Sequence, residues 1–288
     1  MEATYRRTDI MYIPALLLFA VFVVYPFCDG VRIAFTNWNG FSQKYAFVGW
    51  SNFKRLALDE NVRIAFGNTL VYGVGSTFFQ QVLGLSYALL LNLRFPARTF
   101  ARAVVYLPVL ISAVVMGFMW YYLAQYDGAL NEVVVALGGE KRLWLASRAG
   151  SVTMITVINV LQFVGISMVI YLAGLQGIPG MYFEAAEIDG ANAWSRFAHI
   201  TLPLLYPSIV TSVTINLIGG LKLFDVVMAL TGGGPGYSSH SLATLLHTTY
   251  FGSQMAGYAA AIGLLLFCSI LLSTALLQVA FKKREVKY

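Results

Sequence analysis

The chain consists mainly of long, uncharged stretches of apolar residues separated by shorter polar segments. A helix needs about 20 mainly apolar residues to cross the hydrocarbon core of a bilayer, and stretches of this length recur along the sequence. We therefore predict an all-α, polytopic membrane protein with six transmembrane helices, folded as a single domain over residues 1–288. The predicted spans are residues 10–30, 68–93, 103–125, 151–175, 204–231 and 256–281.

The polar segment at residues 179–203, between the fourth and fifth spans, has a pattern of its own, and we call it the 179–203 loop. Met181, Ala185 and Ile188 repeat at the spacing of one helical face, whereas Glu184 lies on another. This arrangement predicts a short amphipathic helix at the membrane surface.

Asp189 and Gly190 interrupt this helix and predict a sharp turn. Glycine adopts positive φ without strain, and the aspartate can accept hydrogen bonds from the free N–H groups of a following helix. Trp194 and Leu202 fall on one stripe of that second helix, so the loop is predicted to form a helix-turn-helix.

The arginine distribution predicts the orientation of the chain. Arg94, Arg98 and Arg102 follow the second span with no acidic residue among them, and such a basic turn favours the cytoplasm. Two crossings separate this turn from the 179–203 loop, so both should lie on the cytoplasmic side. Six crossings then place both termini in the cytoplasm, as Arg6-Arg7 and the basic end of the chain also favour.

Composition excludes several other classes of protein. Hydrophobic residues make up 58% of the chain and its mean hydropathy is +0.70, so a soluble fold is excluded. The net charge of +6 is scattered rather than gathered on one face, and we expect no nucleic-acid partner. His199, His240 and His247 have no metal-ligand spacing, so we predict no metal site and no catalytic residues.

The 179–203 loop and its flanks resemble the EAA signature of permease subunits of ATP-binding-cassette importers. The matching residues are Glu184-Ala185-Ala186, Asp189-Gly190-Ala191, Trp194, Phe197, Ile200, Leu202-Pro203 and Pro207. The resemblance implies that the loop docks in a cleft of a cytoplasmic ATPase subunit. Glu184 would make a polar contact with it, Ala185 and Ala186 would let the helix seat deeply, and Gly190 would permit the bend.

The same resemblance implies a set of partners and a location. They are a second, related permease subunit, two ATPase subunits, an extracytoplasmic solute-binding protein and the lipid bilayer of a bacterial inner membrane. No cofactor is expected in this chain, because ATP and Mg²⁺ would be bound by the separate ATPase. Whether the second permease is a different chain or a copy stays open.

The fifth span carries Asn216, Lys222 and Asp225 in apolar surroundings, where ionisable groups are costly unless they pair or line water. Lys222 and Asp225 are three residues apart and can meet on one helical face. They are therefore either a self-neutralised pair near the outer end of the helix or part of a solute path.

The run from Lys222 to Pro235, KLFDVVMALTGGGP, resembles the fifth-helix motif of maltose-type and glycerol-phosphate-type permeases, which implies a sugar substrate. Gly232–Gly234 with Pro235 predicts a flexible external loop, and it lacks the Gly-Lys-Ser/Thr of a phosphate cradle. Sugars are held by aromatic faces and by amide and hydroxyl groups. The predicted path residues are Asn159, Gln162, Ser167, Asn216, Lys222, Phe224 and Asp225.

Three alternatives remain at this point. The polar path residues could instead form helix-to-helix hydrogen bonds. The solute could be glycerol phosphate or another polar molecule. The chain could also be an ion-coupled secondary transporter in which Lys222 and Asp225 relay protons or sodium ions.

Overall fold

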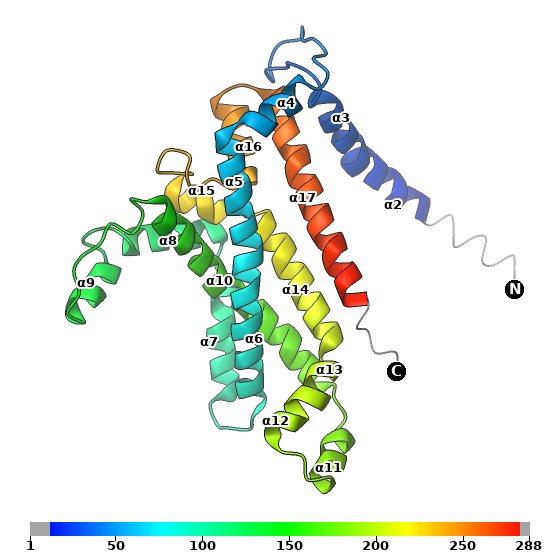
Figure 1. Cartoon of the computed structure of the whole chain (residues 1–288), viewed down its shortest axis with the longest axis vertical. Helices are drawn as coiled ribbons and strands as arrows, with labels where there is room; N and C mark the ends of the chain where they lie inside the picture. The colour runs from blue at the N-terminus through cyan, green and yellow to red at the C-terminus, as the bar shows by residue number, and fades with distance from the viewer. Residues whose placement is uncertain (1–11, 283–288) are drawn as a thin grey trace, which may run out of the picture. The chain divides into compact units, whose positions relative to one another are not determined.

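The computed structural model describes residues 12–282 (Figure 1). Regular structure in this part of the chain is helical, apart from an isolated β-bridge between Thr36 and Phe47. The all-α class is therefore confirmed. Arg6 and Arg7, which support the predicted orientation, lie outside the described residues, as do Lys283 and Arg284.

The chain divides into two compact units. The first contains the described residues up to Val62 together with Leu245–Leu265, and the second contains Arg63–Thr244 and the described residues from Leu266 onward. The helices that end before residue 63 are α2 (Tyr12–Phe19), the π-helix η1 (Ala20–Val24), α3 (Tyr25–Ile33) and α4 (Ser51–Leu58). The next helix is α5 (Glu60–Leu70).

In the first unit, α2, η1 and α3 form one apolar helix, Tyr12–Ile33, in which no residue is buried. The segment after it is held by specific hydrogen bonds. Asn52 donates from Nδ2 to the carbonyls of Ala34 and Thr36, each at 2.8 Å. The Tyr258 hydroxyl donates to Asp59 Oδ2 at 2.7 Å, so this segment is fastened to the start of α17.

The second unit is built around α10, the long helix from Arg148 to Gln176. It packs against α6 and α14, and the three lie side by side (Figure 1). The helices up to α10 are η2 (Val71–Gly75), α6 (Ser76–Asn92), α7 (Arg98–Leu110), α8 (Ala113–Leu123) and α9 (Ala129–Ala136). The later ones are α11 (Met181–Ile188), α12 (Ala193–Arg196), η3 (Phe197–Thr201), α13 (Leu202–Leu204), α14 (Tyr206–Leu221), α15 (Asp225–Thr231), α16 (Leu242–His247), η4 (Thr248–Gly252) and α17 (Ala256–Lys282).

Four continuous helices in the described chain are long and apolar enough to cross a membrane, and the total is six if each of two bent pairs counts as one span. α7 and α8 are bent by 96°. Pro108 lies inside α7 and stays helical, and the break falls at Ile111 and Ser112, whose backbone is extended. Gln162 donates from Nε2 to the freed carbonyl of Ile111 at 2.9 Å, which satisfies it inside the bundle.

The fifth span also differs from its prediction. The helices before α14 are bent from it by 65°, and α14 ends at Leu221 rather than near residue 231. Lys222 and Asp225 therefore do not share one helical face, and the described residues show no ion pair between them. A serine hydroxyl supports the break, because Ser241 Oγ donates to the Leu223 carbonyl at 2.7 Å.

Two buried apolar clusters stabilise the second unit. One joins α8, α10 and α15 and includes Met116, Ile155, Ile158 and Val226. The other joins α6, α10 and the start of α14 and includes Met168. Because both clusters contain residues of α10, this helix packs against the break after α14 through the first cluster and against the residues that follow the 179–203 loop through the second.

Candidate functional site

The turn of the 179–203 loop is a Schellman motif that ends α11. Gly190 has a φ of +74°, the left-handed region that glycine favours. Its N–H donates to the Glu187 carbonyl at 3.1 Å, and the Ala191 N–H donates to the Ala186 carbonyl at 2.9 Å. The predicted turn is therefore present and requires the conformation that Gly190 supplies.

A different residue from the predicted one caps the second helix of the loop. Asp189 was expected to accept from its N–H groups, but Asn192 does so, with Oδ1 accepting from the Ser195 N–H at 2.8 Å. Asp189 is instead the last residue before the turn. Glu187 forms an ion pair with Arg196 across the turn, which ties the two helices of the loop together.

The apolar face of the 179–203 loop is uncovered by the described chain. Met181 is exposed, Ile188 is 87% exposed and Trp194 is 74% exposed. The carboxylate of Glu184, on the neighbouring face, has no hydrogen bond or ion pair within the described residues. Exposed apolar residues beside an unpaired carboxylate are typical of a surface that a partner covers.

A cavity of about 490 Å³ lies where α14 breaks. Five of the seven predicted path residues line it: Asn159, Asn216, Lys222, Phe224 and Asp225. The rest of its wall consists of Gln80, Ala113, Phe163, Ile166, Ile215, Ile218, Gly219, Gly220 and Leu223. Both charged side chains are exposed rather than packed into the protein.

Hydrogen bonds to neighbouring helices fix the amide side chains in the cavity wall. Asn159 Nδ2 donates to Ser76 Oγ at 2.8 Å, and Asn216 Nδ2 donates to Ser167 Oγ at 2.7 Å. Gln80 Nε2 donates to the Asn159 carbonyl at 2.9 Å. These bonds hold α6, α10 and α14 together around the cavity.

The two remaining predicted path residues do not line the cavity. Gln162 supports the break between α7 and α8, and Ser167 accepts the bond from Asn216, so both fit the helix-to-helix alternative. Conversely, Gln80 and Phe163 line the cavity but were not predicted. Gln80 could have been found as a polar residue within an apolar span, whereas nothing in the sequence distinguishes Phe163 from other aromatic residues.

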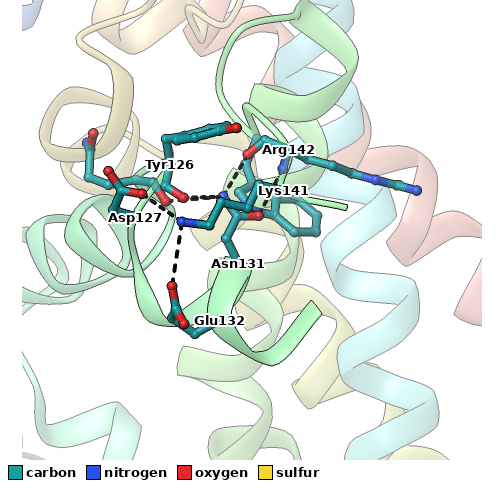
Figure 2. Close-up of polar contacts among 8 residues, drawn as sticks. Tyr126, Asp127, Asn131, Glu132, Lys141 and Arg142 are labelled. Atoms are coloured by element: carbon teal, nitrogen blue, oxygen red, sulfur yellow. Dashed lines mark hydrogen bonds and ion pairs between the residues drawn. The ribbon is translucent and has the colours of Figure 1, made fainter. Parts of the chain in front are cut away.

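The segment between α8 and α10 is organised by the buried side chain of Asn131 (Figure 2). Its Nδ2 donates to the carbonyls of Tyr126 and Arg142, each at 2.9 Å, and its Oδ1 accepts from the Trp144 indole N–H at 3.0 Å. Lys141 Nζ lies 2.7 Å from Asp127 Oδ1, and this hydrogen bond raises the pKa of the lysine. One helix, α10, separates this segment from the 179–203 loop, so the two lie at opposite ends of a span.

The loop after α15 is exposed at Gly232 and Pro235, within the segment predicted to be flexible, and is buried and hydrogen-bonded further along. Ser239 and His240 are buried. Asn68 Nδ2 donates to the His240 carbonyl at 3.0 Å, and the Tyr72 hydroxyl donates to the Ser239 carbonyl at 2.8 Å. Gly233 permits close packing here, since a Cβ on it would lie 2.0 Å from the His240 ring.

We expect the loop after α15 to lose stability in acid. Burial lowers the pKa of His240, whose ring contacts Tyr237 and Thr244. Below about pH 6.5 the unfolded chain binds a proton that the folded loop does not, so stability falls as the pH drops. The decrease in apparent Tm between pH 7.5 and pH 5.5 should be smaller in His240→Gln than in the wild type, and an equal decrease would contradict this assignment.

Within residues 12–282, no group of three or more His, Cys, Asp or Glu side chains is placed to hold a metal ion. Two features of the second unit carry the functional argument: the cavity with amide and charged side chains in its wall, and the uncovered surface of the 179–203 loop.

Several helices that are long and apolar enough to cross a membrane define a multi-pass membrane protein. The chain belongs to the family of binding-protein-dependent transport system inner membrane components, whose profile matches residues 80–286. This match confirms the family that the residues of the 179–203 loop resemble.

Curated relatives match along nearly the whole chain. The multiple sugar-binding transport system permease protein MsmF of Streptococcus mutans is 36% identical over 94% of this chain and 93% of its own length. The trehalose/maltose transport system permease protein MalF of Thermococcus litoralis is 32% identical over 91% of this chain and 89% of its own length.

Among solved structures, the fold is similar to a chain of a bacterial ABC transporter involved in the import of the acidic polysaccharide alginate. The TM-score is 0.84, at 22% identity, covering 98% of each chain. Because the sequence identity is low, this similarity shows the fold alone.

Proposed function

We propose that this chain is a permease subunit of an ATP-driven, binding-protein-dependent sugar importer, and that its substrate is an oligosaccharide. The observation that carries the proposal is the family match together with relatives named for sugar transport. The glycerol-phosphate alternative is disfavoured by the cavity, whose wall carries a single basic side chain, Lys222.

The 179–203 loop couples the permease to the ATPase. Its apolar face is exposed, its turn is fixed by Gly190, and the Glu187–Arg196 ion pair braces its two helices. A braced element of this kind transmits motion as a unit. Closure of the ATPase moves the loop and shifts the helix bundle between inward-facing and outward-facing packings, because the loop makes different contacts in the two states.

The proposal implies a defined assembly. This permease pairs with a second, related permease to form one path, with two ATPase subunits on the cytoplasmic side and a solute-binding protein on the other. ATP and Mg²⁺ are bound by the ATPase subunits. The 179–203 loop and both termini lie in the cytoplasm of a bacterial cell whose inner membrane holds the complex.

The proposal is tested by Glu184→Lys. Glu184 is exposed and has no partner among the described residues, so reversing its charge should disturb the interface with the ATPase and leave the permease fold intact. We expect uptake of sugar into proteoliposomes and transport-coupled ATP hydrolysis to fall by about tenfold, the effect of roughly 1.4 kcal/mol.

Glu140→Lys is the matched control, because it makes the same charge change at an exposed position between α9 and α10. It should leave both activities near wild type. Normal transport by Glu184→Lys would argue against the coupling role. Uptake in vesicles that contain no nucleotide-hydrolysing subunit would instead support the ion-coupled alternative, with Lys222 and Asp225 as the relay.

A further inference from the structure

The wall of the cavity beside the break in α14 contains one basic and one acidic side chain. Lys222 and Asp225 lie on either side of the break, both line the cavity, and both are exposed. Neither forms an ion pair or side-chain hydrogen bond within the described residues. Both groups are therefore available to a solute, and their formal charges cancel.

The amides in the same wall present oxygen atoms. The Nδ2 groups of Asn159 and Asn216 are used by Ser76 and Ser167, and neither Oδ1 accepts a hydrogen bond in the described chain. Gln80 is 1% exposed, and its Oε1 is buried without a donor. Leaving such an acceptor unpaired is costly, so a donor that reached it from the cavity would be bound favourably.

Acceptors therefore outnumber donors among the side chains of this wall. The amide oxygens and the Asp225 carboxylate accept hydrogen bonds, whereas Lys222 donates them. A sugar hydroxyl satisfies such a wall because it can donate to each acceptor. A carboxylate or phosphate on a solute cannot donate to these acceptors, and its attraction to Lys222 is offset by repulsion from Asp225.

We propose that this cavity selects uncharged, polyhydroxylated solutes over anionic ones, and that Asp225 is the residue that sets this selectivity. The inference rests on the proposed function, which supplies a sugar as the transported solute. It adds that acidic sugars and sugar phosphates are poor substrates, in contrast to the acidic polysaccharide of the transporter with a similar fold.

The test measures binding of two matched pairs of probes to the complete permease–ATPase complex in lipid nanodiscs without the solute-binding protein. The pairs are maltose with maltobionic acid, and trehalose with trehalose 6-phosphate. The wild type should bind each neutral sugar about tenfold or more tightly than its anionic counterpart, because the ionised group leaves an amide acceptor without a donor and gains no net attraction from Lys222 and Asp225 together.

Asp225→Asn should lower both ratios to one or below, because the remaining charge is then positive, whereas Lys222→Gln should increase them, because the remaining charge is then negative. Asp127→Asn is the matched control: it removes a carboxylate from the exposed segment between α8 and α9 (Figure 2), and both ratios should stay at the wild-type value.

Equal binding of the neutral and anionic probes by the wild type would overturn the inference. So would unchanged ratios in both Asp225→Asn and Lys222→Gln, or the absence of binding by all four probes. ATP-dependent uptake of maltose or trehalose with the solute-binding protein present is measured separately. If uptake persists but the cavity shows no charge selectivity, only this inference fails. If the complex hydrolyses ATP but takes up neither sugar, the proposed function as a sugar importer fails.

Discussion

Replacing Gly190 with proline is expected to reduce ATP-driven uptake about tenfold or more, with the protein still present in the membrane. Gly190 has a φ of +74°, whereas proline is fixed near −65°, and proline lacks the N–H that Gly190 donates to the Glu187 carbonyl. A conflict of this kind costs about 3 kcal/mol, so the turn must rearrange and redirect the exposed face of α11.

The matched variant is Gly190→Asn, because asparagine tolerates the left-handed region and keeps the N–H. It should retain most of the uptake. The measurement is uptake in proteoliposomes, normalised to the amount of permease found with the ATPase in the membrane. Equal uptake by Gly190→Pro and Gly190→Asn would show that the shape of this turn does not matter for coupling.

Gly220→Ala is expected to lower the thermal stability of the permease by several degrees. A Cβ at Gly220 would lie 2.6 Å from the Tyr72 carbonyl oxygen and 2.8 Å from Gly73 Cα, and backbone atoms cannot move aside as a side chain can. Overpacking of this kind costs about 1–3 kcal/mol. Each kcal/mol lowers Tm by about 2–4 °C for chains of a few hundred residues.

Gly219→Ala provides the control on the adjacent residue. A Cβ at Gly219 meets no atom within 4 Å, so Tm should change by less than about 1 °C. Scanning fluorimetry of the two purified variants in the same detergent measures the difference directly. If the two variants were equally stable, the close approach of α14 to η2 would not limit the packing.

Much of the architecture follows from the local sequence. The spans at Tyr12–Ile33, Arg148–Gln176 and Ala256–Lys282 lie close to their predicted ranges, because membrane helices need long apolar stretches. The turn at Gly190 was also predictable, since its conformation depends on the residue itself.

The breaks in the third and fifth spans could not be predicted, because contacts distant in sequence stabilise them. The break at Ile111 depends on an amide from Gln162, and the break at Leu223 depends on a hydroxyl from Ser241. Residues that fill such roles look the same in the sequence as residues that line a cavity. Gln162, a predicted path residue, bonds the Ile111 carbonyl, whereas Gln80, which is absent from the predicted path, lines the cavity.

The hydrogen bond from Ser241 to Leu223 also has a mechanical meaning. Leu223 belongs to the cavity wall, and Ser241 ends a loop that Asn68 and Tyr72 hold in place. A displacement of this loop would strain the hydrogen bond from Ser241 to Leu223 and shift the stretch between Lys222 and Asp225. The position of this loop and the shape of the cavity are therefore linked through a single hydrogen bond.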